Sequence, residues 1–246
     1  KEVIATPVAD AWLRLRIELR SKQLWGYRVE VKDGALRILI RRPPALSPEP
    51  GRPLKGLRVG LEAGHGGSNT GAIGVATGTP EKDVNRWLVD LLRGELEQRG
   101  AEVIDCRRGD EAISLSRRIQ RAEEANAHLF ISVHNNAAGT ERGFLRVSGT
   151  SVYYKWISNH DFAAAIHRRL LEHLDVGDFG NVGNFNYTPI RTTWMPAMLI
   201  EGMFMSNPKD EALLLDPEFR RTLTQAAREG VEDFLAGALP PAGNNK

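Results

Sequence analysis

Four residues have side chains that can bind a metal ion or act beside one. They lie in or next to apolar runs, or at the start of a predicted helix. His65 lies in the glycine-rich stretch 64–67, and Glu81 follows at the start of a predicted helix. His134 ends a second apolar run, and Glu201 lies within a third. In an α/β protein the strand ends open onto a common crevice, where binding and catalytic groups collect. We therefore expect the four side chains to lie close together.

Two histidines and one glutamate are a common ligand set for a catalytic zinc ion. Such an ion takes about three protein ligands and leaves one position open for water. His65, Glu81 and His134 would supply this set from three separate parts of the chain. The fold would have to assemble the site, because no short motif of closely spaced histidines does so.

Glu201 is the residue that simpler explanations do not cover. A histidine after a strand is more often a hydrogen-bonding loop residue, and a glutamate at a helix start is favourable because it meets the positive end of the helix dipole. Glu201, however, lies inside the apolar stretch 198–204. A buried carboxylate is costly there unless it is paired with a positive group or lies at a metal site.

The composition excludes several classes of protein. The 41% hydrophobic and 26% charged content is that of an ordinary globular chain. A net charge of +2 is too small for a nucleic-acid footprint, so no nucleic-acid partner is expected. No apolar run reaches the roughly 18 residues that indicate a membrane span, so no transmembrane segment is expected. The single cysteine, Cys106, excludes an intrachain disulfide.

A proline-rich segment divides the chain into parts of different pattern. Residues 43–55 hold five prolines, which predicts a semi-rigid linker and a domain boundary. Residues 1–42 alternate apolar and charged side chains in three runs, with a hairpin turn at Asp33 and Gly34, and this predicts a short β-rich segment. It would be the end of a truncated β-module or a meander packed on the main domain. Residues 239–246 are expected to form a disordered tail.

Residues 56–238 alternate between strand and helix patterns, which predicts one large domain that would contain all four candidate site residues. The alternation predicts an α/β fold with a mostly parallel central sheet and helices on both faces. Residues 175–196 are rich in glycine and asparagine and predict a long loop over a substrate groove. The predicted strands are 57–61, 103–104, 129–133, 151–157 and 197–204, and the predicted helices are 81–99, 114–127, 161–174, 209–215 and 217–235.

Several sequence blocks resemble, in type and in order along the chain, the zinc-dependent N-acetylmuramoyl-L-alanine amidases that remodel bacterial cell walls. The resemblance runs from about residue 57 to residue 236. Glu62 and Ala63 depart from the family pattern, which usually has Asp-Pro there, and Cys106 stands where the family has threonine. The blocks that carry the resemblance are 64–67, 71–74, 81–85, 114–118, 129–137, 196–201 and 206–208.

The resemblance implies a metal centre and its chemistry. His65, Glu81 and His134 match the family's zinc ligands, for one zinc ion per chain, and Glu201 matches its catalytic glutamate. The implied reaction is hydrolysis of the amide bond between N-acetylmuramic acid and L-alanine in peptidoglycan. Glu201 would take a proton from the attacking water and deliver one to the leaving amine.

The same resemblance guides the expectations about substrate and location. Asn135, Asn136 and Arg191 are expected to contact the substrate. Because peptidoglycan is the expected partner, the chain is expected in the periplasm or at the cell wall outside the cell. It is expected to act as a monomer, and its sequence identifies no protein activator.

Two other functions stay open at this point. A zinc carboxypeptidase-like hydrolase of the stem peptide would share the ligand set. A non-catalytic peptidoglycan-binding module would not need all four residues, so their joint presence argues against it.

Overall fold

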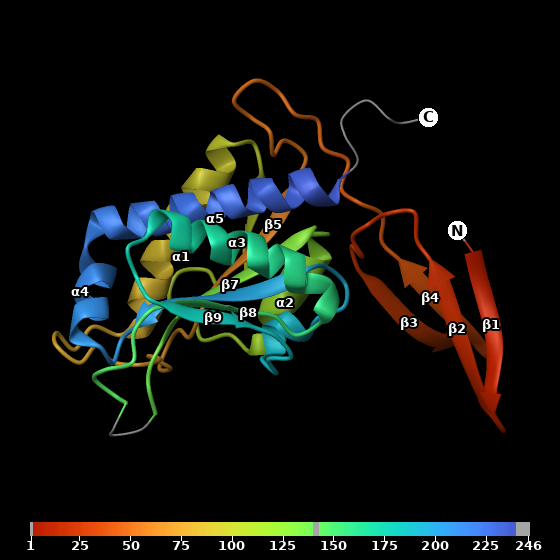
Figure 1. The fold of residues 1–246 in the computed structure, drawn as a ribbon, viewed down its shortest axis with the longest axis horizontal. Helices are drawn as coiled ribbons and strands as arrows, with labels where there is room; N and C mark the ends of the chain where they lie inside the picture. Colours follow the sequence, from red (N-terminus) through yellow and green to blue (C-terminus); the bar gives the residue numbers. More distant parts are fainter. Residues whose placement is uncertain (1, 140–142, 240–246) are drawn as a thin grey trace.

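A six-stranded sheet forms the centre of the protein (Figure 1). The computed structural model describes residues 2–139 and 143–239, so the predicted tail lies outside the described residues beyond Leu239. Strands β6, β5, β7 and β10 run parallel, β8 is antiparallel to β10, and β9 is parallel to β8. The predicted mostly parallel sheet is therefore confirmed. In spatial order the strands are β6 (Glu102–Asp105), β5 (Arg58–Ala63), β7 (Leu129–Asn136), β10 (Ala197–Phe204), β8 (Thr150–Tyr153) and β9 (Asp178–Val182).

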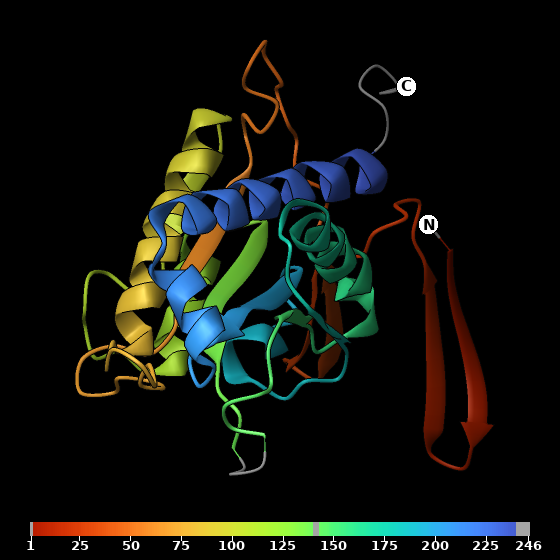
Figure 2. The same cartoon turned by 60° about the vertical axis from the view of Figure 1, so that its left-hand side comes forward.

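Helices cover the two faces of the sheet unequally (Figure 2). One face packs against α1 (Glu81–Gln98), α3 (His160–His173) and α5 (Pro217–Ala238), with α4 (Pro208–Leu215) beside α5. The other face packs against α2 (Leu115–Glu124) and the short 3-10 helix η2 (Thr188–Arg191). Helices thus flank both faces, as predicted. No helix in the described part of the chain is long and apolar enough to cross a membrane.

Burial on both faces explains why the central strands read as continuous apolar runs. In β7, Ile131 and Val133 face the core under α1, α3 and α5, whereas Phe130 faces the core under α2. In β10, Ile200 faces the core under α1, α3 and α5, and Leu199 faces the core under α2. Side chains alternate between faces along a strand, so polar residues at the ends of these strands can also be assigned to a face.

The first 42 residues form two hairpins rather than three strands. They comprise β1 (Glu2–Ala9) with β2 (Trp12–Glu18), and β3 (Tyr27–Lys32) with β4 (Ala35–Ile40), in separate two-stranded sheets. The prediction missed β1, in which alternation is weak. Both β1 and β2 are almost wholly exposed, so the expected inward face is not buried within the described residues.

The segment between the hairpins packs into the main core. Trp25 is 2% exposed, and its ring centroid lies 5.6 Å from that of Phe234 in α5. The guanidinium of Arg41 donates to the carbonyls of Ala127 at 2.7 Å and Trp194 at 2.9 Å. The domain boundary at residues 43–55 stays a prediction. The structure shows a core residue before this segment, Trp25, and another within it, Leu54.

The end of one predicted strand and one predicted loop were wrong in the second half of the chain. Strand β8 ends at Tyr153 rather than at residue 157, because its pairing with β10 stops at Leu199, close to the start of that strand. The predicted loop 175–196 contains β9 and η2. Strand β9 lacks apolar alternation and forms at the sheet edge by pairing with β8, a tertiary contact that local propensity does not report.

Candidate metal centre

Strand register brings His134 and Glu201 side by side. The two residues are paired between the parallel strands β7 and β10. Counting in twos from Phe130 and Leu199 places both on the sheet face that carries α2 and η2. On the far side of His134, the amide of Gly64 donates to the carbonyl of Val133 at 2.9 Å, which places the end of β5 next to His134.

Two glycines leave the space that the ligands occupy. A Cβ on Gly64 would lie 2.2–2.4 Å from three atoms of the His134 ring. A Cβ on Gly71 would lie 2.5 Å from both Glu81 Oε2 and His65 Cδ2, and Gly71 has φ +69°. The glycine-rich stretch therefore lets backbone and ligands approach closely, a role that no other residue type could take at these two positions.

His65 lies in a tight turn with a left-handed backbone, at φ 65°. This conformation is uncommon for a residue other than glycine, so the surrounding contacts must hold it. The ring Nδ1 of His65 lies 3.0 Å from Asn69 Oδ1. From α2, the guanidinium of Arg118 donates to the carbonyl of His65 and, at 3.1 Å, to that of Ala63. The turn is thus held by a side-chain contact with Asn69 and by hydrogen bonds from Arg118.

Glu81 opens α1, and its carboxylate is fixed by amides. Oε1 accepts from the backbone amide of Asn135 and from Nδ2 of Asn85, both at 3.0 Å, and Oε2 accepts from the amide of Ala72 at 2.9 Å. The residue is 3% exposed. A carboxylate held by three donors has one orientation, and here it points at the two histidines.

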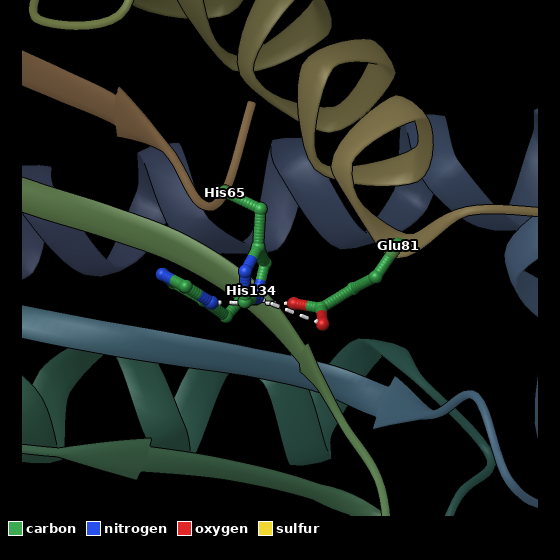
Figure 3. A group of neighbouring side chains, drawn as sticks. All are labelled: His65, Glu81 and His134. Atoms are coloured by element: carbon green, nitrogen blue, oxygen red, sulfur yellow. Dashed lines mark hydrogen bonds and ion pairs between the residues drawn. The ribbon is translucent and has the colours of Figure 1, made fainter. Parts of the chain in front are cut away.

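His65, Glu81 and His134 converge on one point (Figure 3). One candidate ligand atom from each lies within 4.8 Å of the others. His65 Nε2 is 2.9 Å from Glu81 Oε2, and His134 Nδ1 is 3.2 Å from Glu81 Oε1. Two imidazoles and one carboxylate in this arrangement fit a zinc site that keeps a position for water.

The electrostatics of the cluster favour a cation at its centre. Burial alone would raise the pKa of Glu81, but hydrogen bonds with His134 and His65 outweigh burial and lower that pKa well below its usual range. Burial alone would lower the pKa of His134, but the hydrogen bond with Glu81 and the nearby carboxylates of Glu62 and Glu201 raise it to about 9. A metal ion would take the place of the proton that His134 shares with Glu81.

Glu201 has a carboxylate oxygen without a partner. Its Oε2 is buried and accepts no hydrogen bond from the residues that the structure describes. Burial raises the pKa of Glu201 to about 8, although the nearby His134 acts in the opposite direction. Such an orphaned carboxylate beside the ligands fits the presence of a water molecule that a metal would hold there.

The residues predicted to contact substrate have different surroundings. Asn135 is buried, and its side chain donates to Asn85 Oδ1 at 2.8 Å and accepts from the amide of Met203 at 3.2 Å, which favours a role in holding Glu81. Asn136 is half-buried, with Nδ2 3.4 Å from the hydroxyl of Tyr153. Arg191 is exposed in η2 and donates to a neighbouring threonine hydroxyl, outside the ligand cluster. Contact of these three residues with substrate stays a prediction.

Sequence reasoning missed Tyr187. Its hydroxyl lies 3.0 Å from His134 Nε2, and the two ring planes meet at 85° with centroids 5.3 Å apart. Tyr187 precedes η2 in the stretch predicted to be a loop without periodicity, so no local signal distinguished it.

A buried polar group lies beneath the ligands on the same sheet face. Glu62 is fully buried, pairs with Arg118 and accepts from the hydroxyl of Ser132. Its Oε2 lies 3.9 Å from His134 Nε2. Glu62 therefore keeps the carboxylate that the family's aspartate has at this position and holds it close to His134.

Comparison with known proteins identifies the family. A family model described as N-acetylmuramoyl-L-alanine amidase matches residues 59–233. The chain belongs to this amidase family. The matched region contains the three ligand residues and Glu201, and it leaves out both N-terminal hairpins.

Individual proteins similar to this chain include two N-acetylmuramoyl-L-alanine amidases and one uncharacterized protein, YqiI. The catalytic domain of CwlV, an N-acetylmuramoyl-L-alanine amidase from Bacillus (Paenibacillus) polymyxa var. colistinus, is 31% identical with a TM-score of 0.68, over 73% of this chain and 98% of that domain. The Bacillus subtilis amidase LytC is 28% identical over 80% of this chain and 40% of LytC. YqiI of Bacillus subtilis is 30% identical over 74% of this chain and 86% of YqiI. The chain thus spans less than half of LytC and most of YqiI.

Proposed function

We propose that this chain hydrolyses the amide bond between N-acetylmuramic acid and L-alanine in peptidoglycan, with one zinc ion bound by His65, Glu81 and His134. The observation that carries the proposal is the convergence of these three side chains beside Glu201, which strand register places next to His134. Membership of the amidase family supports the same reaction.

The residues of the proposed site have different roles in the reaction. When bound, zinc lowers the pKa of a coordinated water and polarises the scissile carbonyl. Glu201 accepts the proton of the attacking water and passes a proton to the leaving amine of L-alanine. A carboxylate beside the three candidate ligands, with one oxygen free of protein partners among the described residues, is suited to accept a proton and return it. Glu81 keeps its negative charge and balances the metal.

The substrate sets the location and the partners of the proposal. Peptidoglycan lies outside the cytoplasmic membrane, so the chain would act in the periplasm or at the cell wall. We also propose that it acts as a monomer. The CwlD amidase of Clostridioides difficile, 25% identical, has been solved in complex with the GerS lipoprotein. Turnover by the purified chain alone would test whether this chain also needs a partner.

Product analysis separates this proposal from the two alternatives. After digestion of purified peptidoglycan, the amidase reaction gives peptides with an L-alanine amino terminus and glycan strands without stem peptides. Release of D-alanine would instead support the carboxypeptidase-like reaction. Binding without any product would support the non-catalytic module.

Glu201→Gln tests the catalytic assignment. The variant is expected to keep about one zinc per chain and to lose activity by ~10²–10⁴-fold, because only the proton transfer is removed. Glu97→Gln, an exposed change on α1, is the matched control and should keep full activity. Undiminished turnover of Glu201→Gln would remove Glu201 from this role.

A further inference from the structure

Each candidate histidine ligand has a partner on the ring nitrogen that faces away from Glu81. In His65, Nε2 faces the carboxylate and Nδ1 lies 3.0 Å from Asn69 Oδ1. In His134, Nδ1 faces the carboxylate and Nε2 lies 3.0 Å from the hydroxyl of Tyr187. The two nitrogens that face Glu81 are therefore those available to a metal.

These partners decide which nitrogen of each ring carries hydrogen. An amide oxygen can only accept, so Asn69 holds the hydrogen of His65 on Nδ1 and leaves Nε2 free to bind. A tyrosine hydroxyl can both accept and donate. When His134 gives its Nδ1 lone pair to a metal, Nε2 carries hydrogen and donates to the Tyr187 oxygen. Outer partners of this kind fix the ring and strengthen the ligand.

Tyr187 also constrains the His134 ring through its own ring. The edge-to-face contact, with planes at 85°, leaves little room for the imidazole to tilt. Gly64 also lies so close that even a Cβ would overlap the imidazole. His134 is thus in contact both with the end of β5 and with the chain segment that leads into η2.

We propose that Tyr187 is a positioning residue that holds His134 in its metal-binding orientation through the hydroxyl–Nε2 hydrogen bond. The inference rests on the proposed function, because it assigns Tyr187 to the zinc site of that function. Tyr187 belongs to the segment between β9 and η2, so this segment would influence the zinc affinity of the site although it contains none of the three proposed ligands.

Tyr187→Phe tests the proposal because it removes one oxygen and keeps the ring. The zinc dissociation constant, measured by competition with a chromophoric chelator, is expected to rise ~10–100-fold. The melting temperature of the metal-free variant should stay close to that of the wild type. Activity at limiting zinc should fall and should recover when zinc is saturating.

Tyr154→Phe is the matched control. Tyr154 is a buried tyrosine that meets the ring of His160 edge-on and packs in the core on the other face of the sheet, away from the ligand cluster. Its replacement should leave zinc affinity unchanged. A Tyr187→Phe variant that binds zinc as tightly as the wild type would overturn the role of Tyr187 and leave the proposed function standing. A wild-type chain that binds no zinc would overturn both.

A second readout keeps the test decisive if Tyr187→Phe is less stable than expected. Cobalt(II) bound to the wild type and to the variant reports the geometry of the ligands through its visible absorption. A changed spectrum with a weaker cobalt affinity supports the positioning role. An identical spectrum with an identical affinity contradicts it.

Discussion

At the scale of single residues, the site combines groups whose charges are fixed by neighbours with one group whose charge is not. Backbone and side-chain amides fix the Glu81 carboxylate, and partners outside the cluster fix the two histidines. Among these four site residues, only Glu201 has a buried side-chain oxygen without a hydrogen-bond partner in the described part of the chain. This difference supports the proposed division between the residues that would hold the metal and the residue that would move a proton.

The ionisation of Glu201 should make the metal-free protein less stable as pH rises. Burial raises the pKa of Glu201 from an ordinary value of 4.5 to about 8. Between these pH values the unfolded chain has released a proton that the folded protein keeps, so stability falls as pH increases. Glu201→Gln cannot ionise, and it should therefore stabilise the chelator-treated protein by ~1–3 kcal/mol more at pH 8 than at pH 5.

Chemical denaturation of both proteins at the two pH values measures this difference. Groups away from Glu201 titrate alike in the wild type and the variant, so their contributions cancel. The measured difference reports the coupled titration of Glu201 and its neighbour His134. A gain that is the same at pH 5 and pH 8 would show that Glu201 is already ionised in the folded protein.

At the scale of elements, the site depends on how closely strands approach one another. The end of β5 comes so near β7 that only glycine fits at position 64 beside the His134 ring. In addition, Arg118 in α2 stabilises the turn that contains His65 by donating a hydrogen bond to the His65 carbonyl. The ligands are therefore arranged by the packing of elements and not by a continuous motif.

Gly64→Ala should displace His134 and abolish zinc binding. The added Cβ would lie within 2.2–2.4 Å of three ring atoms, a distance that forces the imidazole to move. Gly94→Ala is the control, because its Cβ meets no atom within 4 Å and alanine favours the helix by ~0.5–1 kcal/mol. Zinc content of the two purified variants measures the effect. A full zinc complement in Gly64→Ala would contradict the assigned position of His134.

Most elements could be predicted because their signals are local or periodic. Ser114, at the predicted start of α2, caps this helix by accepting from the amide of Arg117 at 3.2 Å, and the apolar run of β10 matches its bounds. Strand β9 and the role of Tyr187 could not be predicted, since both arise from tertiary contacts between segments without periodicity. Register also could not be read from sequence, although the resemblance located the ligands that register brings together.

At the scale of the whole molecule, the N-terminal residues divide into a packed part and an exposed part. Trp25 lies in the same core as α5, while the hairpin of β1 and β2 projects away from the sheet (Figure 2). The matched family region begins only at residue 59. The catalytic region therefore shares its core with residues that the family does not define.

Trp25→Ala should destabilise the whole protein by ~3–5 kcal/mol, because it removes a large buried side chain from the core. Trp12→Ala removes an equally large side chain that is 74% exposed on β2, and it should change the free energy of unfolding by less than ~0.5 kcal/mol. Denaturant titration of both variants measures the two values. Equal effects would show that Trp25 does not belong to the folded core.

The zinc content of the purified chain tests the central claim most directly. We predict about one zinc ion per wild-type chain and none in His134→Ala, measured by elemental analysis after exhaustive dialysis. The wild type should also lose the release of L-alanine-terminated peptides when zinc is chelated. A zinc-free wild type that still releases these peptides, or a His134→Ala variant that keeps its zinc, would contradict the account.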